Sequence, residues 1–266
     1  PDYSSAASDV YKRQVSVKDL SVQRGGTVVL EGVNLEIRAG DFVGLSGPNG
    51  SGKSTLLLTI IGELEPELGS VTVFGDKPGG PASLGRIAWI SQAASQIPSN
   101  LRISVRELVS LGTTTSTNYL WPFGRAEQRQ RVEKAIRLSG MEEFADRNVQ
   151  TLSGGQRQRA VIARGLATDA EMLILDEPLV GVDRASRNGL LKLLERLCRE
   201  EGKTIIMVTH DQGAIHHCTQ CAICIDGNVR YDESHASRSI PIQAEVLATE
   251  QEYPSSNLAD VPKEWA

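Results

Sequence analysis

The chain has 266 residues, of which 40% are hydrophobic and 23% are charged. This length is enough for one large domain, or one domain with an inserted lobe, and for a sizeable core. The formal net charge of −5 gives no electrostatic reason to expect a nucleic-acid partner. No apolar run approaches the roughly 18 residues that cross a bilayer, and no signal-peptide pattern is present, so we expect a cytoplasmic chain.

The first 14 residues are polar, lack a starting Met and show no periodicity, so we expect them to be a foreign leader outside the fold. Alternating apolar residues in 15–17 and 33–37 predict half-buried antiparallel strands. A fully apolar strand is predicted at 42–46, after a turn. The domain, residues 15–232, is therefore expected to open with a small β layer.

A glycine-rich loop follows the predicted strand at 42–46 and precedes a helix-like run at 56–61. It matches the phosphate-loop pattern G-x-x-x-x-G-K-[ST], in which backbone N–H groups and a helix N-terminus surround an anion. Lys53 is placed to reach the β- and γ-phosphates, and the Ser54 hydroxyl to hold Mg²⁺. The pattern predicts a nucleoside triphosphate site without separating kinase, GTPase and motor. The loop residues are Gly47, Pro48, Asn49, Gly50, Ser51, Gly52, Lys53, Ser54 and Thr55.

The middle of the chain changes in character. Between residues 105 and 145 apolar residues recur at helical spacing, which predicts a helical subdomain, residues 100–160, inserted between β-rich halves. From residue 151 onward helices and strands alternate, which predicts a parallel sheet covered by helices on both faces. Residues 233–266 are expected to form a C-terminal tail with one short helix at 241–251.

Four cysteines in a chain of this size do not indicate a disulfide framework. Three of them lie with two histidines in segment 216–224, where thiolates and imidazoles could ligate a metal. The stretch 222–225 is also typical of a buried strand, in which free cysteine behaves as a small hydrophobe. We favour the buried strand.

A second glycine pair follows Leu152, about a hundred residues after the phosphate loop, and directly precedes a helical run. Ser153, Gly154, Gly155 and Gln156 would form a second helix start suited to an anion, although Ser-Gly-Gly alone could equally cap an ordinary helix. An apolar strand at 172–175 follows at a fitting distance and ends in two carboxylates. This spacing favours a functional role for the glycine pair.

Taken together, these motifs resemble the nucleotide-binding subunits of ATP-binding cassette (ABC) transporters over residues 15–232. The resemblance implies an α/β P-loop NTPase with an ABC-type antiparallel β subdomain, a RecA-like parallel sheet core and an inserted helical subdomain. It also implies that two such domains pair head to tail, the signature of one closing over the ATP held by the other. The matching positions are Gln92 (Q-loop), Ser153, Gly154, Gly155 and Gln156 (signature), Asp176 and Glu177 (Walker B), Asp183 (D-loop) and His210 (switch histidine).

Each matching position has a chemical reason to act on ATP and Mg²⁺. Asp176 supplies an oxygen ligand for Mg²⁺, and Gln92 can touch both the metal's shell and a moving neighbour. Glu177 would orient or deprotonate the attacking water, and His210 would bond the γ-phosphate and hold Glu177. On its own, His210 would be read as a structural histidine. The expected catalytic residues are Glu177, His210, Gln92 and Lys53, and the expected metal ligands are Ser54, Gln92 and Asp176.

One position departs from the family pattern. Family members usually carry an aromatic residue before the glycine of the first hairpin, where it stacks on adenine, and here that residue is Arg24. Its planar guanidinium could stack on the base instead. A solvated turn residue is an equally good interpretation.

The resemblance implies an ATP hydrolase that energises an importer from the cytoplasmic side of the membrane, as a peripheral subunit. Its partners would be a second ABC ATPase subunit of the same sequence, an integral membrane permease and an extracytoplasmic substrate-binding protein, with no nucleic acid. The D-loop segment 179–183 is similar to that of zinc and manganese importers, so a transition-metal ion is the expected cargo. An importer of siderophores or other chelates is the alternative.

Two other classes compete with transport. A non-transport ABC protein acting on DNA or ribosomes would carry a long coiled-coil insertion, a second cassette or basic arms, and the sequence shows none of these. A nucleotide-gated binder without turnover is opposed by Glu177.

Overall fold

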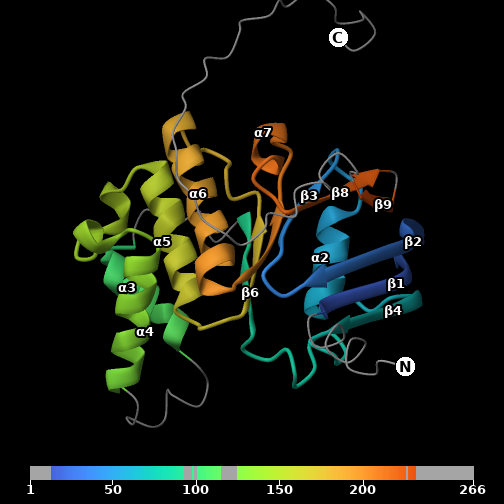
Figure 1. Cartoon of the computed structure of the whole chain (residues 1–266), viewed down its shortest axis with the longest axis horizontal. Coiled ribbons are helices and arrows are strands. Elements are labelled where there is room, and N and C mark those ends of the chain that lie inside the picture. The colour runs from blue at the N-terminus through green and yellow to red at the C-terminus, as the bar shows by residue number, and fades with distance from the viewer. Residues whose placement is uncertain (1–12, 93–97, 99–100, 115–124, 226, 232–266) are drawn as a thin grey trace, which may run out of the picture.

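The structure is a computed structural model that describes residues 13–92, 98, 101–114, 125–225 and 227–231. An antiparallel sheet lies at one end of the molecule, a larger sheet runs through its middle, and a group of helices lies at the other end (Figure 1). This arrangement confirms the expected α/β class with its three parts. The expected tail helix at 241–251 lies outside the described residues.

The antiparallel sheet has the order β2-β1-β4, with β1 at Arg13–Arg24, β2 at Thr27–Arg38 and β4 at Leu68–Val73. Gly25 and Gly26 join β1 to β2 with φ of +57° and +80°, the left-handed conformation of a tight two-residue hairpin turn. β1 begins two residues before the expected start at Val15, because Gln14 is buried and Arg13 forms an ion pair with Glu36 across the hairpin. The rest of the expected leader, residues 1–12, lies outside the described residues.

The larger sheet has six strands, and β3 lies inside it between β7 and β8. Neighbouring strands are parallel except β9, which runs antiparallel to β8, so the expected parallel core is confirmed. In spatial order the strands are β5 (Ile87–Ile90), β6 (Met172–Asp176), β7 (Thr204–Val208), β3 (Phe42–Ser46), β8 (Gln220–Ile225) and β9 (Asn228–Tyr231).

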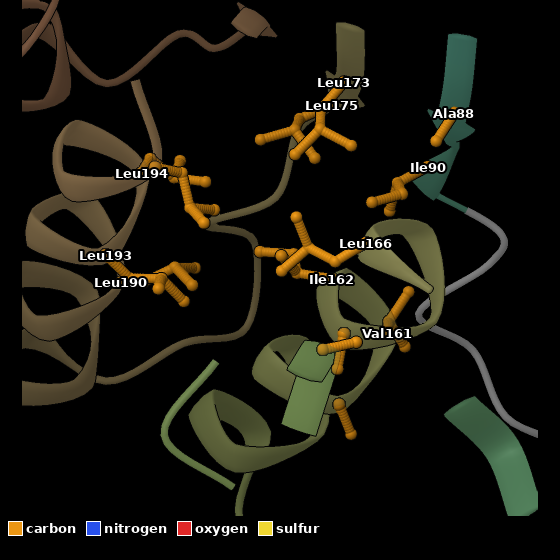
Figure 2. Close-up of a cluster of buried hydrophobic side chains, with 14 of the residues drawn as sticks. Ala88, Ile90, Val161, Ile162, Leu166, Leu173, Leu175, Leu190, Leu193 and Leu194 are labelled. Carbon is orange, nitrogen blue, oxygen red and sulfur yellow. The ribbon is translucent and has the colours of Figure 1, made fainter. Parts of the chain in front are cut away.

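The two faces of this sheet are covered differently. Successive side chains of a strand point to opposite faces, and in β6 Leu173 and Leu175 pack toward α5 (Gly154–Leu166) and α6 (Arg184–Glu201) (Figure 2). Met172 and Ile174 join the other cluster, with α2 (Lys53–Ile61) and the antiparallel sheet. Helices were expected on both faces, and the second face is closed by the helix α2 together with the antiparallel sheet.

The helical lobe contains α3 (Val105–Ser110) and α4 (Arg125–Leu138), with 3-10 turns η2 (Leu111–Thr113), η3 (Glu142–Phe144) and η4 (Val149–Thr151). Two arginines tie it to the core: Arg159 of α5 donates to the Ser139 carbonyl (3.1 Å) and Arg196 of α6 to the Leu138 carbonyl (2.5 Å). Positive charge at the C-terminal end of α4 also complements its dipole. None of the described helices is long and apolar enough to cross a membrane.

Candidate active site

The expected site residues follow the carboxyl ends of neighbouring strands. Ile90 of β5 lies beside Leu175 of β6, and Asp176 lies beside Val208 of β7, which in turn pairs with Leu45 of β3. The next residues along each strand therefore emerge at one edge of the sheet, where open α/β sheets bind their ligands. These residues are Gln92 after β5, Asp176 and Glu177 at the end of β6, His210 after β7 and the phosphate loop after β3.

The phosphate loop owes its shape to glycine. Gly47, Gly50 and Gly52 have φ of +145°, +84° and +95°, which other residues rarely adopt. A Cβ on Gly52 would also come within 2.5 Å of the Leu30 side chain of β2. The antiparallel sheet thus packs against the phosphate loop through Leu30. Lys53 is buried and its ammonium donates to the carbonyl oxygens of Gly47 (2.8 Å) and Pro48 (2.7 Å).

The loop has unsatisfied polar groups of the kind that an anion would satisfy. The start of α2 has no side-chain cap because Gly52 occupies the cap position. The Ser51 hydroxyl is buried and has no hydrogen-bond partner among the described residues. The uncapped helix start, the buried hydroxyl and the buried ammonium fit a polyphosphate, and the exposed Ser54 beside them could serve its Mg²⁺.

The carboxylate of Asp176 lies in an unfavourable environment for its charge. Burial raises its pKa above the ordinary value, the neighbouring Glu177 raises it further, and Lys53 acts in the opposite direction. Because an approaching cation would relieve this cost, the position suits a Mg²⁺ ligand.

Glu177 is held in a strained conformation against the next strand. Its φ is +52°, and its backbone N–H donates to the Val208 carbonyl of β7 (3.0 Å). The Nδ1 atom of His210 lies 3.1 Å from Oε1 and 3.0 Å from Oε2 of Glu177. The Glu177 side chain is 15% exposed and that of His210 is 66% exposed. The structure therefore brings together the two residues that the sequence placed 33 positions apart.

The signature segment forms the first turn of α5. The Ser153 hydroxyl accepts from the Gln156 N–H (3.3 Å), and the Gln156 side-chain oxygen accepts from the Ser153 N–H (3.0 Å), which is a reciprocal capping box. Ser153 and Gly154 are exposed, and Gly155 is buried. No hydrogen bond among the described residues joins this segment to the phosphate loop, and the two helices cover opposite faces of the large sheet.

The D-loop lies against the signature. A Cβ on Gly154 would come within 2.7 Å of the Gly181 carbonyl oxygen, and one on Gly155 within 2.4 Å of the Ser186 Cβ. Asp183 caps α6 by accepting from the Ser186 N–H (3.0 Å), and hydrogen bonds from Ser186 lower the pKa of Asp183. Both glycines are therefore required for a close approach between α5 and the start of α6.

Sequence reasoning missed one ion pair near this site. Arg187 of α6 contacts Asp211, the residue after His210, with Nη1 2.6 Å from Oδ2. Asp211 also caps α7 (Gln212–Ile215). An acidic residue before a helix could have revealed the cap, but nothing in the local sequence pointed to Arg187.

Other expected residues are not brought into contact. Gln92 and Arg24 are exposed, and neither hydrogen-bonds to another expected site residue within the described part of the chain. The described residues hold no group of three His, Cys, Asp or Glu side chains able to bind a metal. The side chains of Cys221 and Cys224 lie outside the described residues.

The fold and this sheet edge define a phosphate-loop nucleoside triphosphatase. The ABC transporter family model matches residues 30–180, and the chain belongs to that family, whose ATP-binding subunits hydrolyse ATP. It is 35% identical to the zinc uptake system ATP-binding protein ZurA of Listeria monocytogenes, over 84% of this chain and 86% of the relative. The iron(3+)-hydroxamate import ATP-binding protein FhuC of Bacillus subtilis is 38% identical, over 74% of this chain and 73% of that protein.

Among solved structures, the dimeric post-hydrolysis form of the ATP-binding cassette MJ0796, bound to ADP and Pi, has a TM-score of 0.66 and 29% identity to this chain. The match covers 82% of this chain and 97% of that one. The expected fold, family and enzyme class are thereby confirmed.

Proposed function

We propose that this chain binds Mg²⁺-ATP at the sheet edge and uses its hydrolysis to drive import of a transition-metal ion through a separate permease. The observation that carries the catalytic part is the contact between Glu177 and His210 beside the phosphate loop. The cargo rests on the similarity to ZurA, a zinc uptake subunit.

In this proposal the loop backbone and Lys53 bind the phosphates, and Ser54, Gln92 and Asp176 hold the metal. Bound Mg²⁺ would neutralise the charge that develops on the phosphates. Lys53 would exchange its two carbonyl contacts in the loop for phosphate oxygens, which accept charged hydrogen bonds more strongly. Arg24, at the end of β1, would lie against the adenine.

Glu177 is the proposed general base, and His210 the group that positions it. With Nδ1 facing Glu177, the ring nitrogen left for the γ-phosphate is Nε2. The exposed position of His210 leaves Nε2 accessible to a nucleotide.

A complete site would need a second copy of the chain. The signature residues Ser153 and Gly154 and the D-loop residue Asp183 are exposed, and Gln156 is partly exposed. Helices α2 and α5 cover opposite faces of the sheet. Two chains arranged head to tail would each place a signature over the other's phosphate loop. The dimeric state of the MJ0796 cassette supports this arrangement.

The transport assignment implies further partners. They are an integral membrane permease and an extracytoplasmic substrate-binding protein, with this subunit peripheral on the cytoplasmic side. The second candidate cargo is a metal chelate, because FhuC, an iron(3+)-hydroxamate import subunit, is 38% identical to this chain over 74% of its length.

The catalytic part is tested with Glu177→Gln in the purified full chain. We expect ATP turnover to fall roughly 10²- to 10⁴-fold, the loss typical of a general base, with ATP affinity retained. The exposed α6 residue changed in Glu200→Gln provides the control, which should hydrolyse ATP at the wild-type rate. Turnover by Glu177→Gln at the control rate would contradict the assignment of the base.

The transport part is tested by purifying tagged chain from membranes and measuring uptake dependent on it. A multi-span partner with uptake of free zinc or manganese supports the metal-ion proposal. Uptake of a ferric chelate with no response to free metal would replace the cargo by the second candidate. Recovery of ribosomes or DNA without a membrane protein would overturn the transport proposal and leave the ATPase assignment intact.

A further inference from the structure

The imidazole of His210 has little support of its own. Its side chain is 66% exposed, so packing does not fix its orientation toward Glu177. Its position must therefore be set by the backbone on either side of it. Both neighbours are anchored, but in different ways.

The anchor before His210 belongs to the sheet. Thr209 is buried, and its N–H donates to the Leu45 carbonyl of β3 (3.1 Å). The Thr209 hydroxyl in turn accepts from the N–H of Asp211 (3.0 Å). This hydrogen bond extends the parallel pairing of β7 with β3, so it does not depend on the residues after His210.

The anchor after His210 depends on α6. One carboxylate oxygen of Asp211 accepts from the Gly213 N–H (2.9 Å) and caps α7, while the other contacts the Arg187 guanidinium (2.6 Å). The Asp211 side chain is 21% exposed and that of Arg187 38%. Because the Arg187 Nε is buried and has no hydrogen-bond partner among the described residues, this ion pair is the contact that holds the guanidinium in place.

We infer that Arg187 is a positioning residue for ATP hydrolysis: its ion pair with Asp211 holds the His210 backbone where the imidazole meets Glu177. The inference rests on the proposed roles of Glu177 and His210. Arg187 and Asp211 are separate from the phosphate loop, so their loss should affect turnover and spare ATP binding. Ser186, next to Arg187, contacts Gly155, so the same turn of α6 joins the signature segment to the His210 loop.

Three substitutions separate the ion pair from simple folding defects. Arg187→Gln removes the charge, and Arg187→Lys restores charge without the planar fork. Asp211→Asn removes the charge but keeps a good helix cap, so α7 should stay intact. The matched control is Glu201→Gln, which breaks an ion pair with Lys134 at the far end of the same helix.

The test measures kcat and KM for ATP in the purified full chain, with each variant made alone and together with His210→Ala. We expect Arg187→Gln and Asp211→Asn to lower kcat about tenfold and to change KM less than about twofold, because a small misplacement of a positioning group costs rate rather than binding. Arg187→Lys should recover part of the rate, and Glu201→Gln should match wild type. In the His210→Ala background, Arg187→Gln should cost less than about twofold, because its effect passes through the missing ring.

Each other outcome overturns a defined statement. An unchanged kcat for His210→Ala would overturn the proposed role of His210 and this inference with it. A loss for His210→Ala without a loss for Arg187→Gln and Asp211→Asn would overturn the inference alone, as would an equal loss with and without His210. If Arg187→Gln fails to fold in a thermal melt, Asp211→Asn decides the question by the same cycle.

Discussion

Helices α2 and α5 both have glycine at or beside their first residue, yet their N-terminal ends are capped differently. At α2, Gly52 stands at the cap position without a side chain, and the Lys53 ammonium bonds to loop carbonyls. At α5, Ser153 and Gln156 cap each other's backbone reciprocally. The free N–H groups at a helix start need partners; no side chain supplies one at α2, whereas Ser153 does so at α5.

The N-terminal ends of α2 and α5 also differ in their exposure to solvent. Ser51 and Lys53 are buried, whereas Ser153 and Gly154 are exposed. In the proposed dimer, this self-capped and exposed helix start would meet the second chain without rearranging. In the proposed function, one glycine-containing helix start binds a ligand and the other is presented to a ligand held by a second chain.

Lys53→Met should break the α2 side of this comparison and have the largest effect on nucleotide binding. We expect ATP affinity to fall at least about 10²-fold, since charged hydrogen bonds to phosphate are each worth roughly 1.5–3 kcal/mol. Equilibrium binding of a fluorescent ATP analogue to the full chain measures this. Lys192→Met, at an exposed position of α6, is the control and should bind normally. Wild-type affinity in Lys53→Met would refute the placement of the phosphates.

Ser153→Arg should break the α5 side while leaving the α2 side intact. The bulky cation would occupy the exposed surface proposed to meet the second copy, so we expect ATP binding within about twofold of wild type but no ATP-dependent pairing. Light scattering after size exclusion, in the slow Glu177→Gln background, measures the pairing. A dimer that still forms with ATP would contradict the composite site.

Much of this site was predictable because its motifs are local. The phosphate loop and the signature are contiguous runs whose residue types report helix starts directly, and both lie where they were expected. The meeting of Glu177 and His210 was expected from the family resemblance, and the alignment of β6 with β7 explains it.

The parts that were missed depend on non-local geometry. β1 was expected to be short because its apolar alternation changes phase between Val17 and Leu20, where the register shifts and Asp19 adopts a φ of +47°. The Asn34 side chain accepts from the Asp19 N–H (3.1 Å), a contact across the hairpin that no local pattern encodes. The Arg187 and Asp211 pair likewise joins residues 24 positions apart.

Asp176→Asn should have the smallest effect of these substitutions: without ligand, we expect it to make the folded chain more stable. Burial and Glu177 raise the pKa of Asp176 above 3.8, so between this ordinary value and its raised value the folded chain binds more protons than the unfolded chain. Its contribution to stability is therefore complete below pH 3.8 and is lost as pH rises through the raised pKa.

Replacing the carboxylate by a neutral amide should raise the melting temperature at neutral pH, and the gain should shrink as pH approaches 3.8. Mg²⁺-ATP should reverse the order, because it stabilises only the chain that retains the metal ligand. Asp183→Asn at the α6 cap is the control: hydrogen bonds from Ser186 lower its pKa, so it should show no such gain. Equal melting temperatures for Asp176→Asn and wild type at neutral pH, with and without Mg²⁺-ATP, would remove Asp176 from the metal site. Burial of the Asp176 carboxylate would then not be linked to binding of Mg²⁺-ATP.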